Sequence, residues 1–395
     1  MDVRFSDRAT KLKASEIREL LKLAEMPEII SFAGGLPAPE LFPVQEMKEV
    51  LMEVMDTDGR AALQYGPTDG INALREVIVT QRMPKVGINN VKAEEIAVTT
   101  GSQQGLEFSA KIFLNKDDVV ICESPSYLGA VNAFKAYEPK FVEVPCDEHG
   151  MIMDELEKAL IANPQAKFIY IIPDFQNPTG RTLPVERRKI IAELAAKYKM
   201  PVVEDGPYSE LIFEGEVFPS IKSFDKEGWV IYLGTFSKTF APGIRIGWIY
   251  ASPEILNKYI IIKQGADLQC SSLDQRAVAL FMKKHNLDEH IEKIIKVYRG
   301  RRDLMLDSME KYFPAGVKFT KPRGGLFAWV ELKEGLDAAE IMQECLKENV
   351  AYVPGGSFFP NGGNANFFRM NFSCMNEEKI VEGVKRLGKV LAKYY

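Results

Sequence analysis

A lysine that directly follows a predicted buried strand is the feature that most constrains this chain. Residues 229–234 form an apolar run typical of such a strand, and Thr235, Ser237 and Lys238 come just after it. A Pro-Gly turn follows, and Arg245 lies seven residues beyond the lysine. A lysine that is desolvated or near other cations has a lowered pKa and can form a Schiff base. Because arginine and hydroxyl groups bind phosphate, the stretch suggests a site for pyridoxal 5'-phosphate (PLP).

A Ser-Lys pair alone is common in surface turns, and that is the simpler interpretation. The whole string Ser-Lys-x-x-x-Pro-Gly-x-Arg-x-Gly is far more specific, and it resembles the PLP-lysine motif of class I and II aminotransferases. The resemblance implies an α/β protein of PLP-dependent transferase fold type I, with a large domain on a mostly parallel sheet and a smaller α+β domain. It also implies that Lys238 holds the cofactor and that Thr235, Ser237 and Arg245 bind it.

Bulk properties exclude several other classes of protein. A chain of 395 residues is long enough for two lobes with a core each, and a net charge of −5 gives no basic field for nucleic acid. Five scattered cysteines and three histidines lack the spacings of a disulfide framework or a metal site, and they fit a reducing cytoplasm. The first residues do not resemble a signal peptide, and no apolar run approaches the ~20 residues of a membrane span.

The N-terminal region carries a second resemblance. Residues 13–25 have the apolar spacing of an amphipathic helix, and residues 29–43, the Gly-Gly loop, are too rich in Gly and Pro for regular structure. Both stretches are similar to the 2-aminoadipate and kynurenine aminotransferase subgroup. The resemblance implies that the backbone at Gly35 lies by the substrate carboxylate. It further implies that Arg18, with Ser15 one turn earlier, binds a distal carboxylate, whereas the alternative is a solvated helix residue.

A phosphate site is predicted where a strand over residues 95–100 turns through a glycine into a helix over residues 102–113. The free N–H groups and the positive dipole end of such a helix attract an anion. Ser102 and Gln103 are therefore the expected phosphate cradle. Tyr65 lies in a turn-rich loop upstream, and the resemblance implies that it reaches the phosphate of the neighbouring subunit; the alternative is a tyrosine packed under a loop.

Polar side chains are also predicted at the ends of buried strands over residues 119–122, 168–173 and 201–205. A tyrosine there can stack on a flat pyridine ring, and a buried carboxylate needs a cation such as a protonated pyridine nitrogen. The resemblance implies that Tyr127 stacks on the ring and that Asn177 contacts the cofactor's 3'-oxygen and the substrate carboxylate. It also implies that Asp205 pairs with the ring nitrogen and that Tyr208 binds the 3'-oxygen. A plain turn at Asn177 and a helix N-cap at Asp205 are the simpler alternatives, and the peptide before Pro178 could be cis.

The C-terminal third contains mostly helices up to residue 312, three strands over residues 324–332, 350–354 and 366–373, and a closing helix over residues 376–394. Arg369 lies among apolar residues in the last strand. A buried arginine without a partner is unfavourable, so an internal salt bridge is the simpler expectation. The resemblance implies that Arg369 instead binds the α-carboxylate of the substrate.

The resemblance also implies a division of the chain. Residues 1–49 would be an N-terminal helix and loop that belong to the small domain, residues 50–285 the large PLP-binding domain, and residues 286–395 the C-terminal small domain.

These features together imply a PLP-dependent aminotransferase with Lys238, Asp205 and Tyr208 as catalytic residues. Its partners would be small amino acids and 2-oxo acids: an L-α-amino acid (2-aminoadipate, aromatic or branched-chain) would give its amino group to 2-oxoglutarate by a ping-pong mechanism. We expect a cytoplasmic homodimer with shared active sites and without metal, nucleic acid or membrane partners. A lyase, decarboxylase or racemase could carry the same lysine motif. A PLP-sensing regulatory domain is disfavoured, because only about 30 residues precede the glycine pair and no basic stripe is present.

Overall fold

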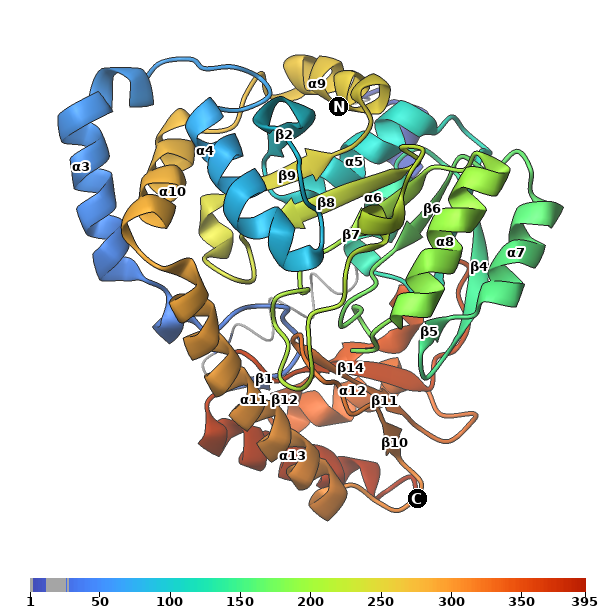
Figure 1. Ribbon diagram of the computed structural model, residues 1–395. Coiled ribbons are helices and arrows are strands. Elements are labelled where there is room, and N and C mark those ends of the chain that lie inside the picture. Colours follow the sequence, from blue (N-terminus) through green and yellow to red (C-terminus); the bar gives the residue numbers. More distant parts are fainter. Residues whose placement is uncertain (1–2, 12–25, 27) are drawn as a thin grey trace.

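The computed structural model describes residues 3–11, 26 and 28–395, which form a larger and a smaller lobe (Figure 1). The helix expected over residues 13–25 lies outside the described residues, and so do Ser15 and Arg18. A short helix, α1 (Asp7–Lys11), precedes that gap. In the described part of the chain, no helix combines the length and apolarity needed to cross a membrane.

The larger lobe is built on an eight-stranded sheet. Its strands are β2 (Ile96–Thr99), β3 (Val119–Ser124), β4 (Lys140–Asp147), β5 (Gly150–Met151), β6 (Phe168–Ile171), β7 (Val202–Asp205), β8 (Val230–Thr235) and β9 (Gly247–Tyr250). They are ordered β2-β9-β8-β7-β6-β3-β4-β5, and β4, β3, β6, β7 and β8 run parallel. Because β9 is antiparallel to both β8 and β2, the carboxyl end of β2 lies at the same edge as those of the five parallel strands. The fold is therefore α/β with a mostly parallel sheet, as the sequence predicted.

Helices cover both faces of this sheet. One face packs against α5 (Ser102–Phe113), α6 (Leu128–Lys135) and α9 (Pro253–Ala266), and the opposite face packs against α7 (Met153–Ala162) and α8 (Val185–Tyr198). Successive side chains of β8 point to opposite faces of the sheet. Ile231 and Leu233 join the core under α5, α6 and α9, whereas Val230 joins the core under α7 and α8. Burial on both faces explains why these strands read as continuous apolar runs.

A second helical layer flanks β2 and β9. It contains α3 (Val44–Ala62), α4 (Asn72–Val77) and α10 (Ser272–Lys284), which share one apolar cluster with Val98 and Trp248 of the sheet. The long helix α11 (Leu287–Tyr312) begins in this cluster with Leu287 and Ile291 and continues into the smaller lobe (Figure 1). The two lobes are thus joined by a continuous helix.

The smaller lobe lies at the bottom of Figure 1, in orange and red. Strands β10 (Lys318–Phe319), β11 (Phe327–Glu331), β14 (Phe367–Asn371) and β13 (Val353–Pro354) form an antiparallel sheet in that order. Helices α12 (Ala338–Lys347) and α13 (Glu377–Leu391) pack near it, and β1 (Ile30–Ser31) pairs in parallel with β12 (Val350–Ala351).

The Gly-Gly loop is held by the smaller lobe. Phe32 N–H donates to the Ala351 carbonyl at 2.8 Å, and the Phe32 carbonyl accepts from Asn371 N–H at 2.8 Å. Further along, Ala38 N–H donates to the Tyr298 hydroxyl at 2.9 Å. These contacts fix the backbone of the loop where it passes the carboxyl edge of the large sheet.

Candidate active site

A cavity of about 450 Å³ lies at the carboxyl edge of the large sheet. Ligand sites in open α/β sheets occur at this edge, at the point where the strand order reverses. The polar groups on its wall come from loops after separate strands and from the smaller lobe: Gly35, Tyr127, Asn177, Tyr208, Lys238 and Arg369. Apolar side chains form much of the remaining wall: Leu36, Leu128, Phe327, Val353 and Phe358.

Lys238 follows β8 and presents its amine to this cavity. Its Nζ donates to the Gly35 carbonyl at 2.8 Å. Burial, reinforced by the positive charges of Arg369 and Arg245, lowers the pKa of Lys238 to about 8. A minority of the amine, far more than for an ordinary lysine, is therefore neutral near physiological pH, as a nucleophile or a general base requires.

Arg369 reaches the cavity from the middle of β14. Its Nη1 donates to Asn177 Oδ1 at 2.8 Å, its Nη2 donates to the Ala33 carbonyl at 2.7 Å, and its guanidinium lies over the Phe327 ring at 4.1 Å. These partners are uncharged, and among the described residues no carboxylate pairs with Arg369, so the internal salt bridge expected as the simpler alternative is not found there. Its buried Nε also has no partner among them. The site thus offers an uncompensated cation to an anionic ligand.

Asp205 is the last residue of β7 and is 1% exposed. Its Oδ2 accepts a hydrogen bond from the Tyr170 hydroxyl at 3.1 Å, while its buried Oδ1 has no partner in the described part of the chain. Burial raises the pKa of Asp205 to about 7. An unpaired buried carboxylate oxygen is costly, and a cationic partner removes that cost. Asp205 is not a helix N-cap, since it ends a strand.

Tyr208 and Asn177 flank the region between Asp205 and Arg369. The Tyr208 ring lies edge-on to Phe327, with ring centroids 6.0 Å apart, and burial raises the pKa of its hydroxyl. The phenol therefore stays protonated and can donate a hydrogen bond. The peptide between Asn177 and Pro178 is cis.

The Asn177 loop is braced by Gln176, which the sequence had not singled out. Gln176 Nε2 donates to the Pro125 carbonyl at 2.8 Å, and Gln176 Oε1 accepts from Thr179 N–H and from Thr179 Oγ1. This residue ties the loop after β6 to the loop after β3, so Asn177 and Tyr127 are set relative to each other.

The turn after β2 and the turn after β8 meet at Arg245. Arg245 Nη1 donates to Ser237 Oγ at 3.3 Å, and its Nη2 donates to the Thr100 carbonyl at 3.4 Å. Thr235 Oγ1 donates to Ser237 Oγ at 3.0 Å. Gly101 has a φ of +70°, a backbone conformation that favours glycine, and it lies against the Arg245 guanidinium. The structure therefore brings the predicted phosphate residues together.

Ser102 is the first residue of α5, and Gln103 is the second. The N–H groups of a first helical turn have no partner within the helix and point to the turn before it. The Gln103 side chain is directed elsewhere: its Nε2 donates to the Gly129 carbonyl at 3.0 Å, and its Oε1 lies 3.5 Å from the Tyr127 hydroxyl. Gln103 can therefore offer its backbone to a phosphate while its side chain supports Tyr127.

Tyr65 is 78% exposed and does not line the cavity. Ser15 and Arg18 lie outside the described residues.

Tyr170 is a site residue that sequence reasoning missed. It lies within β6 and is fully buried, and in the sequence it looks like one aromatic residue in an apolar run. The hint in the sequence is the hydroxyl of a tyrosine within an apolar strand. That this strand pairs with the one that ends in Asp205 becomes clear only once the strand order is known.

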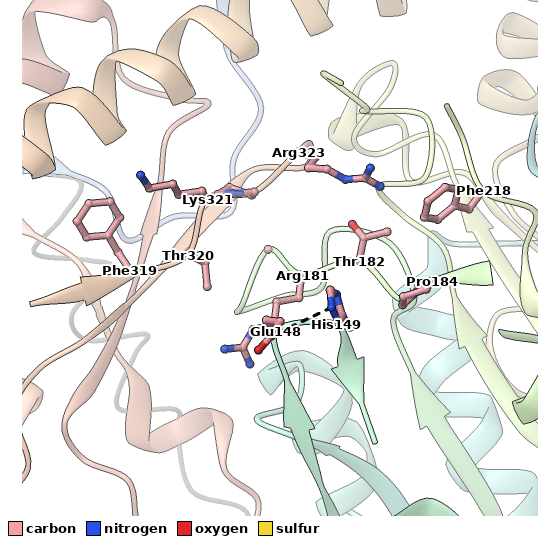
Figure 2. Close-up of a pocket in the computed structure, with 12 residues that line it drawn as sticks. Glu148, His149, Arg181, Thr182, Pro184, Phe218, Phe319, Thr320, Lys321 and Arg323 are labelled. Carbon is pink, nitrogen blue, oxygen red and sulfur yellow. Dashed lines mark ion pairs between the residues drawn. The ribbon is translucent and has the colours of Figure 1, made fainter. Parts of the chain in front are cut away.

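A larger cavity, of about 610 Å³, lies between the β4–β5 turn, the loop after Gly180 and the segment after β10. Figure 2 shows that the charged groups of Arg181 and Arg323 point in different directions, with Arg323 extending toward Phe218. The Arg323 guanidinium lies 5.2 Å from the Phe218 ring centroid. Unlike the cavity at Lys238, this one does not direct its polar groups to a common point.

Comparison with known proteins identifies the family of this chain. The profile of the family described as aminotransferase class I and II matches residues 29–387. Aromatic-amino-acid aminotransferase 1 of Thermococcus litoralis is 46% identical over 391 residues, which cover 98% of this chain and 94% of that protein. The 2-aminoadipate transaminase of Thermus thermophilus is 43% identical over 390 residues, with 98% and 96% covered.

Among solved structures, the kynurenine aminotransferase of Pyrococcus horikoshii, in complex with PMP, superposes with a TM-score of 0.95 at 43% identity, covering 99% of this chain and 97% of that one. A more distant relative has a different role by name: the HTH-type transcriptional regulator NorG of Staphylococcus aureus is 31% identical over 359 residues, covering 91% of this chain and 79% of that protein.

Proposed function

This chain belongs to the class I and II aminotransferases and is a PLP-dependent enzyme of fold type I, and we propose that it moves the amino group of an L-α-amino acid to 2-oxoglutarate by a ping-pong mechanism. The observation that carries the proposal is that the Lys238 amine, the Asn177 amide and the Arg369 guanidinium line one cavity. An amine that titrates near neutral pH and a clamp for an α-carboxylate are the two groups that amino transfer needs.

The residues fit the cofactor in two independent ways. Asp205 Oδ1 is a buried acceptor without a partner in the described part of the chain, and a protonated pyridine nitrogen would supply one. The turn at Gly101 has a positive φ and lies against the Arg245 guanidinium, which suits a phosphate cradle made of Ser102, Gln103, Thr235, Ser237 and Arg245. When bound, PLP supplies an aldehyde that condenses with amino groups and a ring that withdraws electrons from the substrate Cα.

The protein's own groups then divide the work. Arg369 and Asn177 hold the substrate's α-carboxylate; Arg369 Nε, which has no partner among the described residues, supports this, because a carboxylate would satisfy it. With the cofactor bound, Lys238 would take the proton from the substrate Cα as a general base and return it to the cofactor as a general acid. Tyr208 would donate to the cofactor's 3'-oxygen, and Tyr127 would cover the ring. The backbone at Gly35 and the apolar wall exclude water from the reacting atoms.

We propose that the donor is an aromatic, branched-chain or 2-aminoadipate substrate. The apolar residues Leu36, Leu128, Phe327, Val353 and Phe358 support an apolar or aromatic side chain, and the names of the relatives support aromatic amino acids and 2-aminoadipate. Acidic donors would need a further cation for the distal carboxylate. Arg18, assisted by Ser15, is our candidate for it.

The substrate proposal is tested with Arg18→Ala. We expect kcat/KM to fall by on the order of 100-fold for 2-aminoadipate, since a charged hydrogen bond is lost, and to change little for leucine and phenylalanine. A panel of amino donors against 2-oxoglutarate measures this. Equal losses for all donors would remove Arg18 from the assignment.

The reaction itself is tested at Lys238. Borohydride treatment of the PLP-loaded protein should yield a covalent cofactor adduct at Lys238, and Lys238→Ala should abolish both the adduct and amino transfer. Lys226→Ala, at an exposed lysine, is the matched control and should keep both. Near wild-type turnover by Lys238→Ala would refute the proposal.

Two other outcomes remain distinguishable. A lyase, decarboxylase or racemase would release its product from the amino acid without any 2-oxo acid acceptor, so product analysis with and without 2-oxoglutarate separates them. A PLP-sensing regulatory domain would bind PLP without turnover; one relative, NorG, is a transcriptional regulator by name.

We further propose a cytoplasmic homodimer. The segment from α3 to the following loop exposes several large apolar side chains, which suit a second copy of the chain: Val44, Met52, Met55, Leu63 and Tyr65. Tyr65 would reach the partner's phosphate site. We also propose that residues 1–49 and 286–395 move as one small domain against residues 50–285.

A further inference from the structure

The carboxylate of Asp205 is held by a single side chain among the described residues, and that side chain comes from the neighbouring strand. The Tyr170 hydroxyl donates to Asp205 Oδ2 at 3.1 Å, and Oδ1 has no partner in the described part of the chain. Tyr170 is 0% exposed and Asp205 is 1% exposed, so bulk water does not replace this contact.

The strand register explains why the two groups meet. Strands β6 and β7 run parallel, with Tyr170 paired to Val203, two residues before Asp205. Side chains two apart in a strand lie on the same face, so Tyr170 and Asp205 share a face of the sheet. The Tyr170 ring is fixed edge-on against Phe134, with ring centroids 5.4 Å apart. The hydroxyl therefore has little freedom to leave the carboxylate.

We propose that Tyr170 is a positioning residue for the cofactor: its hydroxyl fixes the Asp205 carboxylate in the orientation that turns Oδ1 toward the pyridine nitrogen and keeps that carboxylate ionised. This inference rests on the role proposed above for Asp205. The Tyr170 hydroxyl donates to Asp205, so Tyr170 acts on the cofactor only through that carboxylate.

The electrostatics of the pair agree with this role. Burial raises the pKa of Asp205, and the hydrogen bond from Tyr170 opposes that rise. Burial also raises the pKa of Tyr170 well above its usual value, so Tyr170 remains a proton donor. The other titratable groups that face Asp205 are the phenols of Tyr127, Tyr208 and Tyr232, whose pKa values are likewise raised. None of them replaces the donor that Tyr170 provides, since Asp205 has no other hydrogen-bond partner within the described residues.

Tyr170→Phe tests the proposal because it keeps the ring and its packing against Phe134 and removes only the hydroxyl. We expect the apo variant to bind PLP on the order of 10-fold to 100-fold more weakly, as for a lost hydrogen bond to a charged group. We also expect kcat to fall while KM for the amino acid stays nearly unchanged, because Arg369 and Asn177 are intact. Absorbance titration of apo protein with PLP measures the affinity without turnover.

Tyr352→Phe is the matched control. Its hydroxyl donates to the Ala338 carbonyl at 2.6 Å, and its ring is equally buried and stacks on Phe368. This control loses a buried hydrogen bond in the smaller lobe, whereas Asp205 belongs to the large sheet. It should therefore lower the melting temperature but leave PLP affinity unchanged. If Tyr170→Phe also lowers only the melting temperature, the positioning role is overturned.

A double-mutant cycle with Asp205→Asn separates this inference from the function on which it rests. If Tyr170 acts through Asp205, Tyr170→Phe should not weaken PLP binding further in the Asp205→Asn background. Independent, additive losses would overturn the positioning role while leaving Asp205 in place. If Asp205→Asn alone binds PLP as tightly as the wild type, the proposed role of Asp205 itself fails.

Discussion

Lys238 shows how a single residue acquires its chemistry from its surroundings. Burial disfavours its charged form, and the cations Arg369 and Arg245 act in the same direction, so its pKa falls to about 8. Only the neutral amine attacks an aldehyde, which means that the rate of PLP capture by the apo protein should rise with pH through about 8 and then level off.

Arg369→Met should move the midpoint of this pH profile upward by as much as about one unit, since it removes the positive charge that, after burial, lowers the pKa of the Lys238 amine most. Stopped-flow capture of PLP by apo protein between pH 6 and 10 measures the midpoint. The exposed Arg323, which lies on another cavity, supplies the control Arg323→Met. Superimposable profiles for wild type and Arg369→Met would show that Arg369 does not tune the amine.

Burial has the opposite effect on the pKa of Asp205. Its pKa is raised from 3.8 to about 7 by burial, so between these values the folded apo protein binds more protons than the unfolded chain. The free energy of unfolding contributed by this group therefore falls as pH rises across that window. Asp205→Asn removes the cost, and we expect the apo variant to be more stable than wild-type apo protein by about 1–3 kcal/mol at pH 8 and nearly equal at pH 4.

Urea unfolding of the two apo proteins at both pH values tests this, with PLP affinity measured in parallel. A gain in stability together with a loss of PLP affinity would show that the buried carboxylate is kept for the cofactor. Equal stability at pH 8 would mean that the unpaired oxygen is hydrated or otherwise satisfied.

The motif residues could be found from the sequence because each stands out chemically where it occurs. Lys238, Arg245 and Asn177 are charged or amide residues in turns that follow strands, and Asp205 ends an apolar run. Tyr170 could not be found in this way, because its partner is set by strand order. The uncharged partners of Arg369 were also beyond reach, since the Ala33 carbonyl comes from a loop 336 residues away in the chain.

At the scale of elements, α5 and α9 together fix the turn between β2 and α5, which is proposed to bind the phosphate. Gln104 Oε1 accepts from Thr100 N–H at 2.9 Å and from the buried Lys263 Nζ at 3.0 Å. Asp267 accepts from Lys263, from Gln104 Nε2 and from Thr100 Oγ1. This network fixes Thr100, whose carbonyl accepts from Arg245. Helix α9 therefore braces a turn to which it contributes no direct ligand.

Lys263→Met should loosen that turn and weaken PLP binding by about 3-fold to 10-fold, while binding of pyridoxal, which lacks the phosphate, should change little. Titration of apo protein with each ligand gives the ratio of the two affinities. Lys258→Met, an exposed change on the same helix, is the control. Equal weakening for PLP and pyridoxal would argue for a general loss of structure instead of a phosphate effect.

Most elements were predictable because their periodicity is strong. The strands β3, β6, β7 and β8 are buried on both faces and read as apolar runs, and α5 begins at Ser102 as the glycine turn before it indicates. Helix α4 is α-helical only to Val77; the chain continues as a π-helical turn over Ile78–Arg82 and then as a 3-10 turn over Met83–Val86, which contains Pro84. Proline lacks an N–H and crowds the preceding turn, so regular α-helix cannot continue through it.

At the scale of the whole molecule, the exposed position of Tyr65 needs an explanation. It is 78% exposed and lies away from the cavity of its own chain, although the sequence resemblance assigns it to a phosphate site. A symmetric dimer would resolve this, because each chain could lend Tyr65 to its partner across a two-fold axis. The strand order and the sheet register did not follow from the sequence, and neither does the geometry of such a dimer.

Hybrid dimers test this arrangement directly. Tyr65→Ala and Lys238→Ala should each be nearly inactive alone, since one lacks a phosphate ligand and the other lacks the reactive amine. In a hybrid dimer, one site would combine the intact Lys238 of the first variant with the intact Tyr65 of the second. An equal, fully exchanged mixture should therefore regain about a quarter of wild-type activity, because about half of the dimers are hybrids with one complete site each.

The mixture is prepared by unfolding and refolding the two variants together, and each variant refolded alone is the control. If Tyr65 served the site of its own chain, every site in the mixture would lack either Tyr65 or Lys238, and no activity would return. Recovery thus requires both a dimer and an exchange of Tyr65 between sites, and sedimentation of the mixture as a single dimeric species would tie the regained activity to that assembly.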